Sequence, residues 1–396
     1  MKSRVNTNKK NTMQKLTQKL VAGLAIMSIV MTGCSSDDDG TNPPVVIIPT
    51  TGILEGNITS DTTLNAATVY TLRGATYVKP GVTLTIPAGT RIEADAAFEE
   101  VAFLAVEQGA KINAQGTAAN PIVFTSNSTT PAAQDWGGLV ICGKAITNLG
   151  LNAQAEVTGL TYGGTNSADD SGVYSHIILE YTGNLINDES EFNGMTFYAV
   201  GSQTVVNNIL VSQGSDDGFE WFGGSVSATN LAAIGCQDDS FDWTEGWNGT
   251  VSNLYSDQSS ATGLSADSRG IEADNNATNP LLTPISNPTL NNITLIGRNS
   301  AEVAKEGAIW LRRGTHATIN NVYITDFKST AAGAGYGVFF DGPDSSAFFT
   351  ANPIQNININ NVTTTTNITA AMTANTTASG AGNGANAATW MDWMGL

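Results

Sequence analysis

The sequence predicts an all-β fold, a solenoid of parallel strands, on the basis of three observations. A short apolar stretch with an Asn at a fixed place recurs along the chain, the spacing is about 22 to 24 residues where no loop intervenes, and 41 Gly accompany only 13% charged residues. This composition argues against a helical protein rich in Glu, Lys and Leu. A repeat of that length leaves no room for helices and suits one coil of a parallel β-helix, whose strands stack about 4.8 Å apart.

Each repeat contains a longer and a shorter strand. The longer strand surrounds the recurring Asn, and we expect the stacked Asn residues to form an amide ladder at a turn. The longer strands cover residues 204–214, 227–236, 250–258, 289–298, 318–327 and 356–365, with aligned Asn208, Asn230, Asn253, Asn292, Asn321 and Asn361. The shorter strands precede them at residues 194–201, 218–224, 240–247, 270–276, 307–314 and 337–342, and most open with Gly.

Apolar and acidic residues alternate within the shorter strands, as in Phe219-Glu220-Trp221, so one face should be buried and the other should carry acids. Aligning these strands predicts a column of Thr196, Glu220, Asp242, Glu272, Ile309 and Phe339, with three consecutive acids. The same alignment places Trp221, Trp243 and Trp310 in a second column. That column is either a stacked aromatic ladder in the core or, if it faces outward, a flat platform for sugar rings.

The ends of a solenoid need caps, because exposed first and last coils leave strand edges unpaired. We expect the residues before about Gly81 to form the first cap, and Trp390 and Trp393 to fold back over the last coil. The register also separates Cys142 from Cys236 by about three coils, roughly 14 Å at the spacing between strands. A disulfide requires Cα atoms within about 7 Å, so both should be free thiols.

Three segments carry a family resemblance: QGTAANPIVFTS at residues 115–126, DDGFEWFGG at 216–224 and DDSFDWTEGW at 238–247. They resemble the pectate-lyase-like right-handed β-helices and, more closely, a family of secreted and surface β-helix proteins in Bacteroidetes. The resemblance covers roughly Gly81 to Leu396. It implies a right-handed winding, which the handedness of parallel crossovers also favours. It implies no established reaction.

The N-terminal residues have the layout of a secretory signal. A basic stretch leads into an apolar run from Leu20 to Met31 that is too short to span a bilayer. The run ends in Met31-Thr32-Gly33-Cys34, which resembles the bacterial lipoprotein signal with its lipidated Cys, and the acidic stretch after it resembles the export signal of Bacteroidetes surface lipoproteins. We expect a signal peptide at residues 1–33, a lipidated Cys34 with an export signal and tether at 34–52, and one β-helix domain at 53–396, held on the outer face of the outer membrane.

The charge of the chain excludes one class of partner. Six of the 17 Lys and Arg precede Cys34 and no acid does, which leaves 11 bases against 35 acids and a formal charge of −24 in the remainder. Nonspecific binding to nucleic acid requires many Lys and Arg to displace counterions from phosphates, so nucleic acid is excluded as a partner. Cations are the more natural ligands of such a chain.

The acids concentrate in one run of coils. Between Gln213 and Asp274 there are 11 acids and one base, Arg269, so internal ion pairs cannot neutralise them. Carboxylates on adjacent coils repel by about 3 to 4 kcal/mol at an effective dielectric constant near 20. A bound Ca²⁺, which prefers clustered carboxylate oxygens, a solvated acidic stripe and catalytic carboxylates are three open interpretations. The candidate metal ligands are Asp216, Asp217, Glu220, Asp238, Asp239, Asp242, Glu272 and Asp274.

An enzyme on this scaffold is the alternative to a binding module. The resemblance brings in lyases, which use Ca²⁺ and a basic residue to remove a proton from a uronate, and glycoside hydrolases, which use paired Asp residues. A groove for polyuronates should be basic, whereas this chain is acidic. We therefore expect a non-catalytic module that binds a glycan or a partner surface protein, with Ca²⁺ as a structural ion. The candidate catalytic residues are Asp238, Asp239, Asp242 and Arg269, and the candidate ligand-binding residues are Trp221, Trp243, Arg312 and Arg313.

Overall fold

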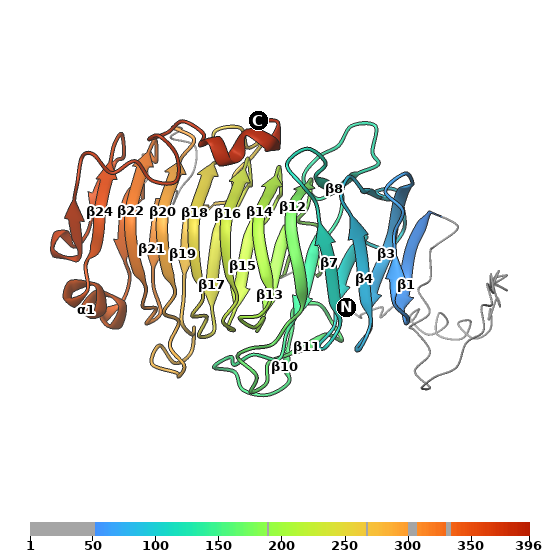
Figure 1. Ribbon diagram of the computed structural model, residues 1–396. Coiled ribbons are helices and arrows are strands. Elements are labelled where there is room, and N and C mark those ends of the chain that lie inside the picture. Colours follow the sequence, from blue (N-terminus) through green and yellow to red (C-terminus); the bar gives the residue numbers. More distant parts are fainter. Residues whose placement is uncertain (1–51, 188–189, 267, 300–306, 330–333) are drawn as a thin grey trace, which may run out of the picture. The chain divides into compact units, whose positions relative to one another are not determined.

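The computed structural model describes residues 52–187, 190–266, 268–299, 307–329 and 334–396. These residues belong to one compact unit (Figure 1). Parallel ladders join 24 strands of the described residues, and the chain folds as a right-handed parallel β-helix, which confirms the predicted fold class. Cys34 and the rest of the expected signal and tether up to residue 51 lie outside the described residues.

The longer strands stack into one continuous ladder. Adjacent members pair in parallel with side chains in register, as Val206 pairs with Ala228 and Ala228 with Val251. The members are β12 (Gly172–Glu180), β14 (Val205–Ser212), β16 (Ser227–Ile234), β18 (Thr250–Asp257), β20 (Thr289–Ile296), β22 (Thr318–Thr325), β24 (Ile354–Ile359) and β26 (Met372–Ala374).

The shorter strands form a second ladder, and its outer surface carries the acids. Because every side chain on a strand alternates between the two faces, Phe219 and Trp221 point into the core while Glu220 between them points outward. The members are β9 (Leu139–Cys142), β13 (Met195–Tyr198), β15 (Phe219–Phe222), β17 (Phe241–Thr244), β19 (Arg269–Ala273), β21 (Gly307–Leu311), β23 (Tyr336–Phe340) and β25 (Thr364–Thr366).

The N-terminal coils extend the same solenoid. The strand that begins at Val69 pairs with its neighbours on both sides in the parallel sense, so the residues before Gly81 form coils of the solenoid and not the separate cap that we expected. These strands are β1 (Ile53–Ile58), β2 (Thr62–Thr63), β3 (Val69–Val78), β4 (Thr83–Pro87), β5 (Arg91–Ala94), β6 (Phe103–Val106), β7 (Lys111–Gln115) and β8 (Ile122–Ser126).

The recurring Asn residues occupy a corner of the coil. They adopt a left-handed backbone, with φ of 55° at Asn208 and 66° at Asn253, which Asn tolerates better than most residues. Four of the side-chain amides donate to the amide oxygen of the preceding coil: Asn230 to Asn208 at 2.9 Å, Asn253 to Asn230 at 2.7 Å, Asn292 to Asn253 at 2.9 Å and Asn321 to Asn292 at 2.8 Å. The predicted amide ladder is present in these five residues.

The prediction that Asn361 is the last member of that ladder was wrong. Asn320 pairs with Gln355 and Val322 with Ile357, so Asn356 and not Asn361 follows Asn321 in the column. The strand reads Asn-Ile-Asn-Ile-Asn-Asn, and this alternation offers several registers to an alignment by sequence. Asn361 instead donates to Asp326.

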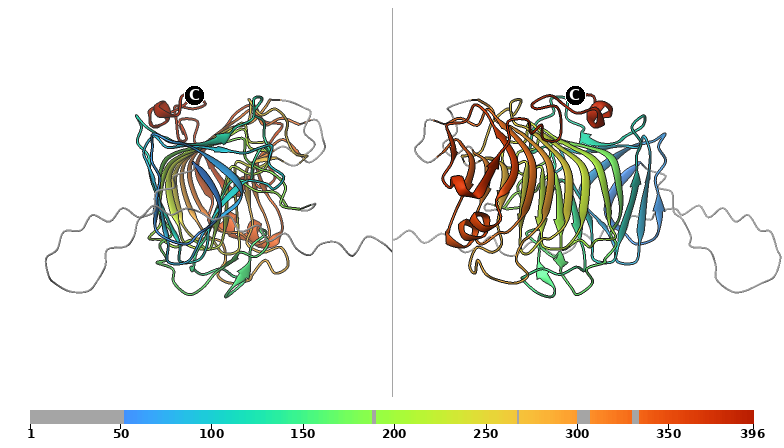
Figure 2. Two further views of the ribbon diagram at one scale, coloured as in Figure 1. Left: turned by 90° about the vertical axis from the view of Figure 1, so that its right-hand side faces the viewer. Right: turned by 60° about the vertical axis from the view of Figure 1, so that its left-hand side comes forward.

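The core is a stack of apolar side chains inside the coils, and Figure 2 shows the coils end-on around it. Trp221 and Trp243 are each 1% exposed and belong to this stack, with the Trp221 ring parallel to that of Phe197 at 5.5 Å between centroids. These two Trp residues therefore form no outward platform for sugars. Cys142 and Cys236 are buried free thiols, as the spacing predicted.

In the described residues, helices occur in two connections and in the C-terminal segment, and the repeat length did not predict them. They are α1 (Pro343–Ala351) and the 3₁₀ turns η1 (Thr369–Ala371) and η2 (Thr389–Met394). The η2 turn contacts β14 and β16, and the Trp393 ring lies 5.1 Å from that of His176. The C-terminal segment thus lies along the middle coils (Figure 1), and not over the last coil as expected, because an outward apolar stripe there includes Leu210, Ala232 and Tyr255. None of the helices in the described part of the chain has the length and apolar character needed to cross a bilayer.

Candidate functional site

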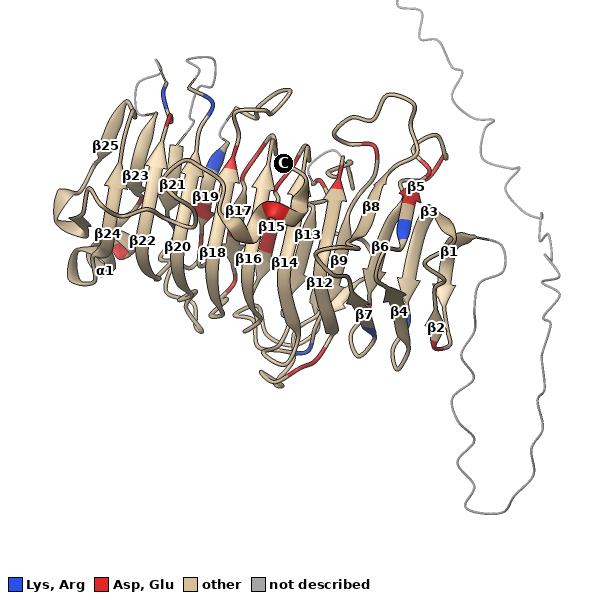
Figure 3. Ribbon diagram, turned by 45° about the horizontal axis from the view of Figure 1, so that its top comes forward, with Lys and Arg blue, Asp and Glu red and all other residues tan. Residues whose placement is uncertain are grey.

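Three consecutive acids share one outward column, as the sequence predicted. Thr196 pairs with Glu220, Glu220 with Asp242, and Asp242 with Glu272. Asp and Glu on these successive coils are coloured in Figure 3. The carboxylates of the column therefore lie one coil apart, at a spacing of about 4.8 Å.

The next member of this column is Trp310, and our assignment of Ile309 was wrong. Glu272 pairs with Trp310, whereas Ile309 pairs with Ile271 in the core. Residues 307–311 are all buried and all apolar or Gly, so no alternation marks their faces, and a slip by one residue exchanges inside and outside. Trp310 therefore shares no column with Trp221 and Trp243. Its ring is covered by Phe339, at 4.3 Å between centroids, and by the guanidinium of Arg269, at 4.4 Å.

A cavity of about 380 Å³ opens on the outer face of β15, β17 and β19. Its floor comes from the acid column and from the Asp pairs before β15 and β17, while inserted loops add further acids. Among the described residues, its lining contains nine carboxylates, three Ser hydroxyls and no Lys, Arg or His. The carboxylates are Glu156, Glu191, Asp216, Asp217, Glu220, Asp238, Asp239, Asp242 and Glu272, and the hydroxyls are Ser190, Ser215 and Ser265.

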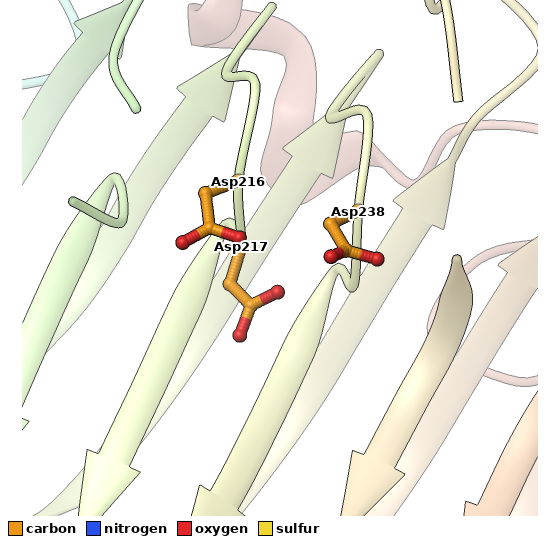
Figure 4. Close-up of side chains that lie close together, drawn as sticks. All are labelled: Asp216, Asp217 and Asp238. Carbon is orange, nitrogen blue, oxygen red and sulfur yellow. The ribbon is translucent and has the colours of Figure 1, made fainter. Parts of the chain in front are cut away.

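The carboxylates converge in three groups of three, each with one oxygen per residue within 4.8 Å of the others. Figure 4 shows the first group, with Asp216 and Asp217 from the turn before β15 and Asp238 from the turn before β17. Each group joins side chains from adjacent coils. The groups are Asp216, Asp217 and Asp238; Asp217, Glu220 and Asp242; and Asp239, Asp242 and Glu272.

Hydrogen-bond donors of the protein reach only some of the carboxylate oxygens in the cavity. Asn193 donates to Glu220 at 2.6 Å, and the backbone N–H of Asp239 donates to Asp217 at 3.0 Å. The Ser265 hydroxyl donates to Asp238. In contrast, the Oδ1 atoms of Asp239 and Asp242 are buried and have no hydrogen-bond partner. A buried acceptor without a partner costs about 1 to 3 kcal/mol, so the position of these two oxygens is unfavourable.

Burial and mutual repulsion make the carboxylates hard to ionise. Burial, followed by the charges of neighbouring acids, raises the pKa of Asp217 and of Asp242 well above the usual value. The pKa of Glu272 is raised to about 7 by burial, although Arg312 opposes the shift. An ion-free cavity therefore favours protonated carboxyls, and a bound cation would favour their ionised forms.

The arginines lie at one end of the acid column. Arg312 and Arg313 each donate to Asp274 at 2.6 Å, and Arg312 also pairs with Glu272. Asp274 is not among the residues that line the cavity, so the structure separates it from the other predicted metal ligands. Arg269 is 2% exposed, because it packs on the Trp310 ring beside Glu272. Its guanidinium is inaccessible to a substrate in the cavity.

Two lining residues, Glu156 and Glu191, were missed by the sequence analysis. Glu156 lies in the hairpin of β10 (Ala153–Gln154) and β11 (Thr161–Tyr162), an insertion between β9 and β12, and accepts a hydrogen bond from Tyr198 at 3.2 Å. Glu191 lies in the loop after β12 and accepts from Ser215 at 3.4 Å. Both belong to non-repeating loops, where no register marks their position in space.

A separate buried carboxyl anchors the same insertion. Glu245, at the end of β17, accepts hydrogen bonds from Tyr162 at 2.7 Å and Thr147 at 3.1 Å. Burial raises its pKa to about 7, although both hydrogen bonds oppose the shift. This contact joins the insertion that carries Glu156 to the coil that carries Asp242.

The sequence of the β-helix is similar to that of a known protein family. The model of a family described as a pectate-lyase-like β-helix domain matches residues 56–394. The chain belongs to this family. Comparisons with curated proteins and with solved structures gave no significant match. Membership in the family accounts for the solenoid, but a fold of this kind hosts several functions, so the role of the cavity must be argued from its own residues.

Proposed function

We propose that the chain is a non-catalytic binding module on the cell surface, stabilised by Ca²⁺ in the acidic cavity, with a glycan or a partner surface protein as its ligand. The observation that supports the ion is the pair of buried, unpartnered oxygens on Asp239 and Asp242 in a cavity lined by nine carboxylates. A cation would supply the attraction that these oxygens lack and offset the repulsion between adjacent coils.

The ligand chemistry favours Ca²⁺ over other metals. The lining offers carboxylate and hydroxyl oxygens, and the described residues add no His or Cys to it. Ca²⁺ takes six to eight oxygen ligands in flexible geometry, whereas Zn²⁺ and Cu²⁺ prefer nitrogen and sulfur. Mg²⁺ requires a more regular octahedron and keeps several waters, so it is the natural control in a binding experiment.

The arrangement of the bases argues against a lyase. Removing a proton from a uronate requires a basic group that reaches the substrate. Arg269 is buried against Trp310, and Arg312 is held by Glu272 and Asp274. A glycoside hydrolase stays the second candidate, because a carboxyl such as Glu272, with a pKa of about 7, next to ionisable neighbours is typical of a general acid.

The ion is tested by thermal unfolding of EDTA-treated protein with and without added Ca²⁺. At a concentration 100 times the dissociation constant, a ligand that binds only the folded state stabilises it by about 2.7 kcal/mol, so the melting temperature should rise by several degrees. Mg²⁺ should have a smaller effect. An unchanged melting temperature after Ca²⁺ addition would contradict the proposed ion.

Binding is separated from catalysis by running both assays on one glycan panel. We expect retention on a ligand without release of reducing ends or unsaturated products. The variant Glu272→Gln, compared with Asp341→Asn at an exposed position far along the solenoid, tests the hydrolase. Turnover that Glu272→Gln abolishes and Asp341→Asn preserves would replace the binding module by an enzyme.

The anchor to the outer membrane is a proposal from the residues before the solenoid, and it is tested by fractionation. We expect Cys34→Ser to move the protein from the membrane fraction to the soluble fraction, because the lipidated sulfur is lost. Ser35→Ala is the matched control and should leave the protein with the membrane. Retention of the Cys34→Ser variant in membranes would rule out this anchor.

A further inference from the structure

We propose that the cavity binds at least two divalent cations in a row along the solenoid, one at Asp216, Asp217 and Asp238 and one at Asp239, Asp242 and Glu272. This inference rests on the proposed binding of Ca²⁺ and adds the number and the places of the ions. It assigns different tasks to Asp238 and Asp239, which are neighbours in the chain.

The first argument is that the two groups have no residue in common. In each group, one oxygen from every residue lies within 4.8 Å of the others, and two oxygens at this separation can both contact one Ca²⁺ at its usual distance of about 2.4 Å. The groups are offset along the solenoid: the first uses the turns before β15 and β17, and the second uses the turn before β17 together with β17 and β19. Two ions can therefore be held at once without competing for a ligand.

The second argument is the state of the oxygens. Asp239 lines the cavity and is 5% exposed, its buried Oδ1 atom has no hydrogen-bond partner, and the Oδ1 atom of Asp242 in the same group also lacks one. In the first group, Asp217 is 7% exposed and shares its surroundings with Asp216 and Asp238. Both groups thus place buried carboxylates close together, and the second group leaves acceptors unfilled.

The third argument is charge. Each group contains three carboxylates, and one divalent ion compensates for two of their charges at most. An ion in the second group lies about one coil, roughly 5 Å, from the first group, and it contributes no ligand contact there. Arg312 reaches Glu272 in the second group, and the first group has no such arginine among the described residues of the lining. A single ion in the second group therefore leaves the three carboxylates of the first group without a cation in direct contact.

The middle group connects the two sites. Asp217 belongs to the first site, Asp242 to the second, and Glu220 lies between them with one oxygen held by Asn193. Carboxylates in this position can bridge two ions. The volume also suffices for two ions, because about 380 Å³ corresponds to about twelve waters at roughly 30 Å³ each.

The number of ions is measured on the full chain, freed of metal with EDTA, by native mass spectrometry and by calorimetric titration with Ca²⁺. Two or more Ca²⁺ per chain are expected. Energy transfer from Tb³⁺ to Eu³⁺ in the wild-type protein gives a readout without mutation, because it requires two lanthanide ions close together in one molecule. Strong transfer is expected when both ions are added, and its absence would contradict neighbouring sites.

The places of the ions are measured with Asp238→Asn and Asp239→Asn. Each variant should lose one ion and keep the other, while Asp341→Asn keeps both, and circular dichroism checks that each variant is folded. One ion in the wild type that either variant abolishes would overturn this inference and leave the proposed Ca²⁺ site intact. No bound ion in the wild type would overturn the proposed function as well, so the two failures are distinguishable.

Discussion

Two columns of this solenoid stack similar side chains one coil apart, with opposite results. In the amide column, Asn230, Asn253 and Asn292 bond to one another at 2.7 to 2.9 Å. In the acid column, Glu220, Asp242 and Glu272 have the same spacing, yet they repel and Asp242 keeps a buried oxygen without a partner. An amide carries both a donor and an acceptor, so a stack of amides satisfies itself. An ionised carboxylate only accepts, so a stack of carboxylates must obtain its donors or cations from outside.

The external partners of the acid column differ along its length. Asn193 donates to Glu220 at one end, and Arg312 pairs with Glu272 at the other. Asp242 in the middle lines the cavity and keeps its Oδ1 atom without a hydrogen-bond partner, although the charge of Arg312 opposes the rise in its pKa that burial causes. A ligand is therefore most needed at Asp242, in the middle of the acid column.

Breaking the amide column should have the largest effect on stability. Replacing Asn253 with Leu removes one hydrogen bond to each neighbouring coil, about 1 kcal/mol each, and forces a branched residue into a backbone with φ of 66°, about 1 to 2 kcal/mol more. We expect the free energy of unfolding in urea to fall by about 3 to 4 kcal/mol.

The variant Asn253→Gly separates the two causes, because Gly adopts this backbone without strain. It should lose less stability than Asn253→Leu. A cost below about 1 kcal/mol for the Leu variant would show that the ladder contributes little.

The sequence predicted most members of both columns, and it failed where the register of a strand was ambiguous. The amide column could be read from the sequence because the Asn at each corner adopts a backbone few residues accept, so it recurs with every coil from Asn208 to Asn321. The prediction failed at the last coil, where Asn356 continues the column, because alternate Asn residues there fit more than one register. The acids were placed correctly up to Glu272, and the uniformly apolar strand around Trp310 then gave no sign of its faces.

The cavity itself could be predicted only in part. Its floor belongs to the repeat and was found from Asp216 to Glu272, whereas Glu156 and Glu191 come from loops whose path depends on tertiary packing. The pairing of Asp274 with Arg312 and Arg313 could not be foreseen either, because it depends on the correct register between β19 and β21.

The carboxyl of Glu245, which is not among the residues that line the cavity, predicts a dependence of stability on pH. Its pKa is raised from 4.5 to about 7 in the folded chain, mainly by burial and also by the charge of Glu156. A raised pKa means that the folded state binds the proton more tightly, so this contribution is present below pH 4.5 and is lost as the pH rises through 7. The upper limit of the loss is about 3 kcal/mol.

The measurement compares wild type with Glu245→Gln, both in EDTA, by urea unfolding at pH 5, 6, 7 and 8. The advantage of the wild type over the variant should decrease across this range, because Gln does not titrate. A difference that is constant with pH would show that Glu245 does not titrate between these values.

Neutralising the centre of the acid column should have opposite effects without and with ions. Without metal, Asp242→Asn removes a carboxyl whose ionisation is opposed by burial and by the charge of Glu272, and we expect a gain of about 1 to 2 kcal/mol at pH 8. With saturating Ca²⁺ the same variant loses a ligand and should be less stable than the wild type. The melting temperature checks both signs, with Asp341→Asn as the control. A change of the melting temperature with the same sign under both conditions would show that Asp242 is not a ligand of the ion.

The smallest effect is expected where a carboxyl already has a hydroxyl donor. Tyr162→Phe removes the hydrogen bond to Glu245 of 2.7 Å and keeps the ring in its apolar contacts. The loss should be about 1 kcal/mol at pH 8, and the pH at which stability declines should move upward, because this hydrogen bond lowers the pKa of Glu245. Combining the change with Glu245→Gln should abolish the shift. A shift of this pH to lower values in Tyr162→Phe would contradict the prediction. It would show that the Tyr162 hydroxyl favours the protonated form of Glu245, in contrast to the way that Asn193 stabilises Glu220.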